Sequence, residues 1–86
     1  MIGLSKHARE QAARRGLSEE IVLSVAQAPE QRFVVRPGRE LRQSRVAMPI
    51  GGTLYLIRVV VDVGPNDETV VTVYRTSKIE KYWSKA

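Results

Sequence analysis

The stretch "TLYLIRVVVDVGPNDETVVTVYRT", residues 53–76, decides how this chain folds. Residues 53–63 are rich in β-branched residues, and their apolar side chains fall on both sides of an extended backbone. This pattern is typical of a central strand with part of each face covered. Turn-forming residues at 64–68 separate it from a second alternating run at 69–76. The stretch therefore predicts two paired strands inside a sheet.

Two further β-prone runs precede this stretch. They are "QRFVV" and "ELRQSRVAM", and Pro37-Gly38 between them is a strong turn signal. We therefore expect four strands joined by hairpins, at about residues 31–36, 40–48, 53–63 and 69–76.

The first third of the chain is predicted to be helical. Ser5 is a suitable N-cap for a helix over about 5–15, and Gly16 is a natural C-terminal stop. Ser18 is the N-cap of a second helix over about 18–28, which Pro29 ends. Helices followed by strands favour an α+β fold, with two N-terminal helices packed on a four-stranded antiparallel β-meander.

Length and composition limit the possible functions. Eighty-six residues suit a single domain, 1–86, and the absence of cysteine excludes disulfides and thiolate chemistry. A single histidine cannot supply a multi-histidine metal site, so we expect no metal and no cofactor. No stretch approaches the length of about 18 apolar residues that spans a bilayer, so we expect no membrane association and a cytoplasmic location.

The charge indicates a polyanionic partner. The net charge is +5, and five arginines fall within residues 32–45, where only Glu40 opposes them (Arg32, Arg36, Arg39, Arg42 and Arg45). Arginine presents a fork of donors that matches phosphate oxygens. A merely solubilising basic face would look the same on charge alone.

One face of the first helix gathers polar residues. His7, Gln11 and Arg15 recur every four residues, with Arg14 beside them, and Ala8 and Ala12 lie opposite. Histidine can accept or donate a proton near neutral pH, and guanidinium groups can stabilise the extra charge of a reacting phosphoryl group. These are the elements needed to cleave RNA without a metal, although a lone helical histidine is more often an ordinary surface residue.

The last strand and its continuation carry the second group of candidates. If Val71 and Val73 face the core, Thr72, Tyr74 and Thr76 face the other way. A cluster of cations and hydroxyls then follows, comprising Arg75, Thr76, Ser77 and Lys78.

Three aromatic and charged side chains have two interpretations each. Arg58 stands in an otherwise apolar run and can pair with Asp62 on the same face or bind phosphate. Tyr82 and Trp83 can anchor the end of the chain by packing or stack on RNA bases.

These motifs resemble a known family. "SKHAREQAARRGLSEEIV", followed by "VVVDV" and "ETVVTVYRTSKIEKYW", is similar to the small toxin-like ribonucleases of the barnase–EndoU–colicin–RelE-like superfamily. The likeness is to the branch with an N-terminal His-Ala-x-x-Arg-x-x-x-Arg-Gly helix. Gln11 is a departure, because an arginine is common at that position.

The resemblance implies a metal-independent endoribonuclease, the toxin of a toxin–antitoxin pair, that acts on RNA and is neutralised by an acidic antitoxin protein. Carried over by position, the catalytic residues are His7, Arg15, Thr76 and Lys78. We expect the RNA-binding residues to be Gln11, Arg14, Arg58, Tyr74, Arg75 and Ser77.

Two other classes of function stay open on the sequence. The same basic residues suit a non-catalytic nucleic-acid-binding or regulatory module. They also suit a protein-interaction domain that uses its basic face against an acidic partner.

Overall fold

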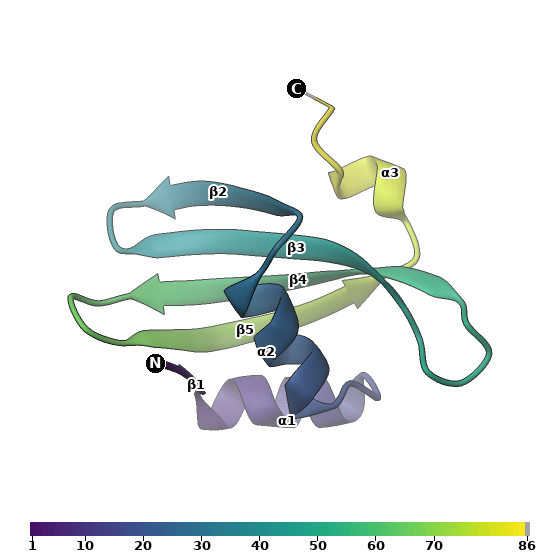
Figure 1. The fold of residues 1–86 in the computed structure, drawn as a ribbon, viewed down its shortest axis with the longest axis horizontal. Coiled ribbons are helices and arrows are strands. Elements are labelled where there is room, and N and C mark those ends of the chain that lie inside the picture. Colours follow the sequence, from purple (N-terminus) through teal and green to yellow (C-terminus); the bar gives the residue numbers. More distant parts are fainter. Residues whose placement is uncertain (86) are drawn as a thin grey trace.

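A computed structural model describes residues 1–85, which form a mixed five-stranded sheet and three helices (Figure 1). The strand order across the sheet is β1-β5-β4-β3-β2. The elements in chain order are β1 (Ile2–Leu4), α1 (Lys6–Arg14), α2 (Glu19–Gln27), β2 (Gln31–Arg36), β3 (Arg39–Ala47), β4 (Leu54–Val63), β5 (Glu68–Thr76) and α3 (Ile79–Tyr82).

The expected fold of two helices on a four-stranded antiparallel meander is therefore wrong. A fifth strand, β1, pairs with β5 in parallel, so that Ile2 lies opposite Glu68 and Leu4 opposite Val70. A third helix, α3, follows β5. A strand of three residues is too short to show alternation, and its partner lies more than sixty residues away, so no local pattern indicated it.

Serine side chains begin both N-terminal helices. The Ser5 hydroxyl accepts a hydrogen bond from the Ala8 amide at 3.1 Å, and the Ser18 hydroxyl accepts one from Ile21 at 3.2 Å. Each contact satisfies one of the amides that a first helical turn leaves without a partner. Gly16 follows α1 with a φ of 67°, a left-handed conformation that favours glycine, and the chain turns there toward α2.

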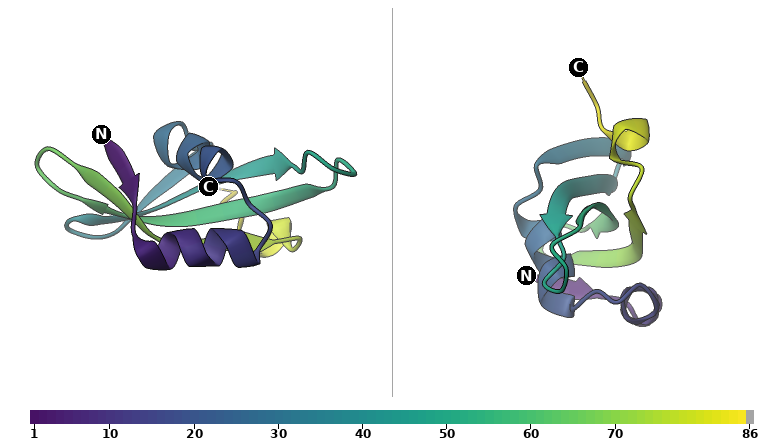
Figure 2. Two further views of the ribbon diagram at one scale, coloured as in Figure 1. Left: turned by 90° about the horizontal axis from the view of Figure 1, so that it is seen from below. Right: turned by 90° about the vertical axis from the view of Figure 1, so that its right-hand side faces the viewer.

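The two faces of the sheet are covered differently. Figure 2 shows α2 on one face, while α1 and α3 lie toward the other side. The core lies under α2, where Val22, Val25 and Ala26 pack with the sheet. The sheet residues of this core include Ile57, Val59, Val61, Val70 and Val73. The opposite face, which we call the open face, is covered in part by α3 and the residues after it, which contact Gln43 of β3 and Gln31 of β2.

Strand β5 changes phase at a β-bulge. Val70 pairs with Val61 and Thr72 with Val60, so Val71 is an additional residue in the ladder. Val70 and Val73 are therefore the buried residues, and the expectation that Val71 and Val73 share the core face is wrong for Val71. Tyr74 is 37% exposed and lies on the open face, opposite Arg58 of β4.

Arg42 is a charged residue within the core. Its side chain is 1% exposed, and its guanidinium donates to both carboxylate oxygens of Glu68 at 2.8 and 2.7 Å. The same group donates to the Ala26 carbonyl at 2.7 Å and to Glu40 at 3.0 Å. Arg42 thus joins the end of α2 to strands β3 and β5.

None of the helices within residues 1–85 is both long and apolar enough to cross a membrane.

We predict that Arg42→Ala lowers the free energy of unfolding by about 3 kcal/mol, because Glu68 and Glu40 lose their buried cation. Urea denaturation measures this loss. Arg32→Ala is the matched control, since Arg32 also pairs with Glu40 but is 52% exposed; its cost should stay below about 1 kcal/mol. Equal costs for the two variants would contradict the structural role of Arg42.

The Arg42–Glu68 pair also predicts a pH dependence. Hydrogen bonds from Arg42 hold the pKa of Glu68 below its usual 4.5. A carboxyl whose pKa is lower in the folded state stabilises the fold above pH 4.5, and this contribution is lost as the pH falls through the folded-state value. Urea denaturation between pH 6 and pH 3 should therefore show a smaller loss of stability for Glu68→Gln than for the unchanged protein. Glu20→Gln, on the exposed surface of α2, should keep the full pH dependence.

Candidate functional site

A row of four polar and aromatic side chains crosses the open face of the sheet. In the strand register, Gln31 of β2 lies opposite Gln43 of β3, Gln43 opposite Arg58 of β4, and Arg58 opposite Tyr74 of β5. Successive residues of a strand point to opposite faces, so these side chains share the face away from α2.

Glutamine side chains hold Arg58 in place. The Arg58 Nε donates to the Gln43 side-chain oxygen at 2.9 Å. The Gln43 amide donates in turn to the Gln31 oxygen at 2.7 Å and to the Tyr82 carbonyl at 3.1 Å. Of the two interpretations of Arg58, the ion pair with Asp62 is not formed, because Asp62 binds Arg39 at 2.6 Å.

The same glutamines fix the C-terminal segment on the sheet. Gln31 donates to the Ser84 carbonyl at 2.7 Å and accepts from the Ser84 amide at 3.1 Å. The Tyr82 ring then lies 4.4 Å from the Arg58 guanidinium, and the Trp83 ring lies 4.2 Å from that of Arg45. Both rings therefore pack against side chains of the sheet, as expected if residues 82–83 anchor the end of the chain.

Helix α1 brings a second guanidinium to this row. Arg15 lies over the Tyr74 ring at 5.0 Å, and the rings of Tyr74 and Tyr82 meet edge to face at 6.1 Å. Arg15, Arg58, Tyr74 and Tyr82 thus form one continuous surface contributed by α1, β4, β5 and α3. We call these four residues the Arg15–Arg58 surface.

Gln11 explains the position of α1. Its side-chain oxygen accepts a hydrogen bond from the Val73 amide at 2.8 Å, on the edge of β5 beyond the end of β1. A neutral amide satisfies a backbone donor that an arginine, which has no acceptor, could not. Gln11, which stands where the ribonuclease-like helix pattern commonly has an arginine, therefore attaches α1 to the sheet. This places Arg15, one turn later, beside Tyr74.

The electrostatics of the surface suit an anionic ligand. A hydrogen bond from Tyr74 lowers the pKa of Tyr82, and the ammonium of Lys81 lowers it further. Burial lowers the pKa of Arg58 below its usual value, but a guanidinium still keeps its proton at neutral pH. No carboxylate pairs with Arg15 or Arg58 in the part of the chain that the structure describes.

The arginine-rich hairpin, by contrast, is largely neutralised within the fold. Carboxylates bind four of its five arginines at 2.6–3.1 Å, in the pairs Arg32–Glu40, Arg39–Asp62, Arg42–Glu68 and Arg45–Glu30. Glu40 is the only carboxylate within residues 32–45, but the fold adds Glu30, Asp62 and Glu68 from outside that stretch.

His7 lies apart from the residues that follow β5. Helix α1 runs in the same direction as β5, since the Ser5 amide bonds to Val70 and Gln11 to Val73. His7 is exposed near the start of α1, and a rise of about 1.5 Å per residue places it roughly 12 Å before Arg15. Within residues 1–85, no hydrogen bond or ion pair joins His7 to the segment 76–78.

The remaining predicted residues have separate surroundings. Thr76 accepts a hydrogen bond from the Lys78 amide at 3.0 Å, a local turn that leads into α3, and Ser77 and Lys78 are exposed. Arg14 is exposed and borders a cavity of about 190 Å³ together with Gln11 and Arg15. Arg75 points away from the Arg15–Arg58 surface, toward the face that α2 covers.

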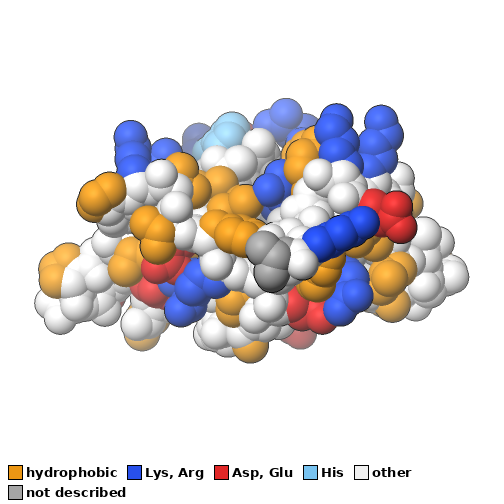
Figure 3. Space-filling view, turned by 90° about the horizontal axis from the view of Figure 1, so that it is seen from above, with side chains coloured by type: hydrophobic (Ala, Val, Ile, Leu, Met, Phe, Trp, Pro, Cys, Tyr) orange, Lys and Arg blue, Asp and Glu red, His pale blue; other side chains and the backbone are white. Residues whose placement is uncertain are grey.

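Figure 3 shows Lys and Arg side chains gathered along the upper edge of the molecule, with the histidine among them. No group of three or more His, Cys, Asp or Glu side chains within residues 1–85 is arranged to hold a metal ion.

The chain belongs to the DUF4258 family, a domain of unknown function, whose model matches residues 4–75. The match includes His7, Arg15, Arg58 and Tyr74. It ends at Arg75, so α3 and Tyr82 lie beyond it. Comparisons with curated proteins and with solved structures gave no match.

We predict that Gln43→Leu loosens α3, because the Tyr82 carbonyl and Arg58 both lose a hydrogen-bond partner. Trp83 is the only tryptophan, so its fluorescence reports on α3, and its emission should shift to longer wavelength. Exchange of the Trp83 amide, which donates to Ile79, should accelerate by about tenfold or more, for a loss of about 1.4 kcal/mol. Gln27→Leu, at the exposed end of α2, is the control. Unchanged emission and exchange in Gln43→Leu would contradict this role.

Proposed function

We propose that this protein is a metal-independent endoribonuclease that binds RNA at the Arg15–Arg58 surface. The observation that carries the proposal is the contact series Arg15–Tyr74–Tyr82–Arg58. In it, two guanidinium groups that have no carboxylate partner within residues 1–85 lie against two tyrosine rings. Guanidinium groups bind phosphate oxygens, and exposed aromatic rings stack on unpaired bases.

The reaction needs a base, an acid and cations. The base takes the proton from a ribose 2′-OH, whose oxygen attacks the adjacent phosphorus. The bond from phosphorus to the 5′-oxygen breaks as the acid protonates that oxygen. The products are a 2′,3′-cyclic phosphate and a free 5′-OH. Arg15 and Arg58 stabilise the additional negative charge on the phosphate oxygens.

Two side chains are candidates for proton transfer. Tyr82 lies in the surface itself, and its lowered pKa favours its use as a base. His7 is the second candidate, because an imidazole can both accept and donate a proton, but it lies on the exposed part of α1 some two turns before Arg15. The two assignments are separated by comparing Tyr82→Phe with His7→Ala.

We predict that the purified protein cleaves single-stranded RNA in the presence of EDTA and leaves DNA intact. Arg58→Gln should lower the cleavage rate by about 100-fold or more, because it removes a cation from the reacting phosphate. Arg36→Gln removes the same charge from an exposed position at the end of β2, and it should retain most of the activity. Gel analysis of labelled RNA, with detection of the cyclic phosphate, measures both.

Three results would contradict this function. Loss of cleavage in EDTA would show that a metal is required. Equal activity of Arg58→Gln and Arg36→Gln would show that the Arg15–Arg58 surface takes no part in cleavage. Salt-dependent binding without cleavage products would instead favour a nucleic-acid-binding module.

The biological setting belongs to the same proposal. We place the protein in the cytoplasm, as the toxin of a toxin–antitoxin pair, where it acts on cellular RNA and an acidic antitoxin protein neutralises it. Four of the five hairpin arginines already have carboxylate partners, so Arg15 and Arg58 are among the cations available to the acidic partner. Growth arrest on expression, relieved by a neighbouring gene product and absent in Arg58→Gln, tests this setting.

A further inference from the structure

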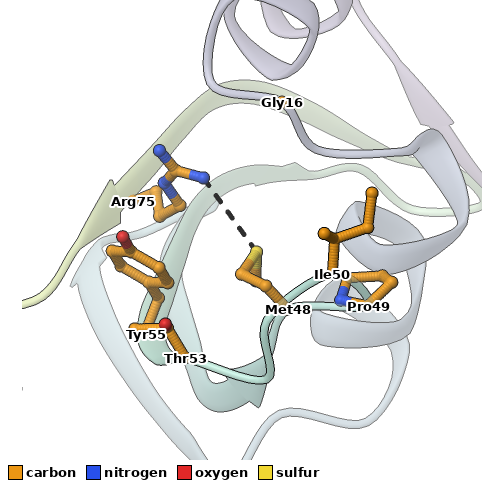
Figure 4. Close-up of a pocket in the computed structure, with 7 residues that line it drawn as sticks. All are labelled: Gly16, Met48, Pro49, Ile50, Thr53, Tyr55 and Arg75. Atoms are coloured by element: carbon orange, nitrogen blue, oxygen red, sulfur yellow. Dashed lines mark hydrogen bonds between the residues drawn. The ribbon is translucent and has the colours of Figure 1, made fainter.

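A pocket on the opposite face of the sheet from the Arg15–Arg58 surface is not used by the proposed function. It has a volume of about 330 Å³ and lies where the turn after α1, the loop between β3 and β4, and the end of β5 meet (Figure 4). Its lining residues are Gly16, Met48, Pro49, Ile50, Thr53, Tyr55 and Arg75. This volume lies at the lower end of the range of about 300–1,000 Å³ that is usual for small-molecule sites.

Arg75 is the charged group of this pocket. Its guanidinium lies 4.5 Å from the centre of the Tyr55 ring, and one of its nitrogens lies 4.0 Å from the Met48 sulfur. A ring and a thioether hold the group in position, but neither neutralises its charge. Among residues 1–85 no carboxylate pairs with Arg75, although five other arginines of the chain have such partners.

The two ends of the pocket differ in character. The Arg75 guanidinium and the hydroxyl groups of Tyr55 and Thr53 lie on one side, and the apolar side chains of Met48, Pro49 and Ile50 lie on the other (Figure 4). Ile50 is 92% exposed, so its side chain stands at the mouth of the pocket without being part of the core. A side-chain carbon at Gly16 would lie 4.0 Å from the Arg75 nitrogen, so glycine leaves the space beside the guanidinium open.

We propose that this pocket binds a small carboxylate with a compact apolar body. The planar guanidinium fork matches the two oxygens of a carboxylate, and a half-buried site strengthens such a charge-assisted pair. The apolar body lies against Met48, Pro49 and Ile50, which removes part of the exposed Ile50 surface from water. The site is separate from the ribonuclease proposal, because Tyr74 and Arg75 point to opposite faces of β5.

The test is a titration of the ¹⁵N-labelled protein with phenylacetate, followed by amide chemical shifts. We expect saturable shifts at Gly16, Ile50, Thr53 and Tyr55 below about 10 mM, the range of a weak small-molecule site. Phenylacetamide has the same ring without the negative charge, so it tests whether binding needs the carboxylate. Inorganic phosphate has the negative charge without a ring, so it tests whether binding needs the apolar body. Each should bind at least about tenfold more weakly than phenylacetate, equivalent to about 1.4 kcal/mol.

Two variants test the residues. Arg75→Gln should weaken phenylacetate binding at least about tenfold. Because Arg75 also packs on Tyr55, its replacement can disturb the sheet, so a second variant is placed in the loop between β3 and β4. Ile50→Glu puts a negative charge at the exposed mouth of the pocket, where it repels the carboxylate of the ligand, and should weaken binding to a similar degree. Val34→Glu is its matched control, since Val34 is 72% exposed on β2, and it should bind as the unchanged protein does.

The proposal is overturned if phenylacetate causes no saturable shifts, if phenylacetamide or phosphate binds equally well, or if the shifts map to Tyr74 and Arg15. It is also overturned if Ile50→Glu binds as tightly as Val34→Glu. None of these results depends on whether the protein cleaves RNA.

Discussion

The hydrogen bond from the Val73 amide to Gln11 determines how α1 meets the sheet. Strand β5 has a strand partner on its outer edge only from Glu68 to Val70, and the backbone amide of Val73 lies beyond it. A buried or half-buried amide without a partner is costly, so α1 must lie where Gln11 can reach it. Ala8 and Ala12 then pack into the core, and Arg15 comes to lie over Tyr74.

Two groups of arginines differ in what they contact. Four of the five hairpin arginines bind carboxylates, and Arg42 does so inside the core, where it connects α2, β3 and β5. Three half-buried arginines have an aromatic ring in place of a carboxylate in the described chain: Arg15 on Tyr74, Arg58 on Tyr82, and Arg75 on Tyr55. A ring orients a guanidinium without neutralising it, so these three keep their charge available to a ligand.

Local signals in the sequence were sufficient for the helix starts and for the strands of the central hairpin. Ser5 and Ser18 cap helices because capping depends on contacts only three residues away. Partners distant in sequence were not predictable in this way. The parallel pairing of β1, the carboxylates that bind the hairpin arginines, and the glutamine partner of Arg58 all depend on register between strands.

The candidate surface likewise depends on contacts between residues that are distant in sequence, which local patterns did not indicate. Arg15, Arg58 and Tyr74 were recognisable as unusual residues for their positions, and the fold brings them together. The contributions of Gln31 and Gln43 were missed, although a glutamine at the start of one β-prone run and in the middle of the other was the available signal. Residue chemistry and the family resemblance grouped the segment 76–78 with His7, but α1 and β5 place the two near opposite ends of the strand.

The additional residue in β5 has a consequence for how relatives of this chain should be aligned. Glu68 must face Arg42 on the α2 side, and six residues later Tyr74 must face the open side. In a regular strand, two residues that are six positions apart point to the same face. The additional residue Val71 shifts the alternation by one position, so Glu68 and Tyr74 point to opposite faces. A relative that lacks one residue here without other change would exchange the faces of Tyr74 and Arg75. Insertions and deletions between residues 68 and 74 therefore carry more information about the two sites than substitutions at Val71 do.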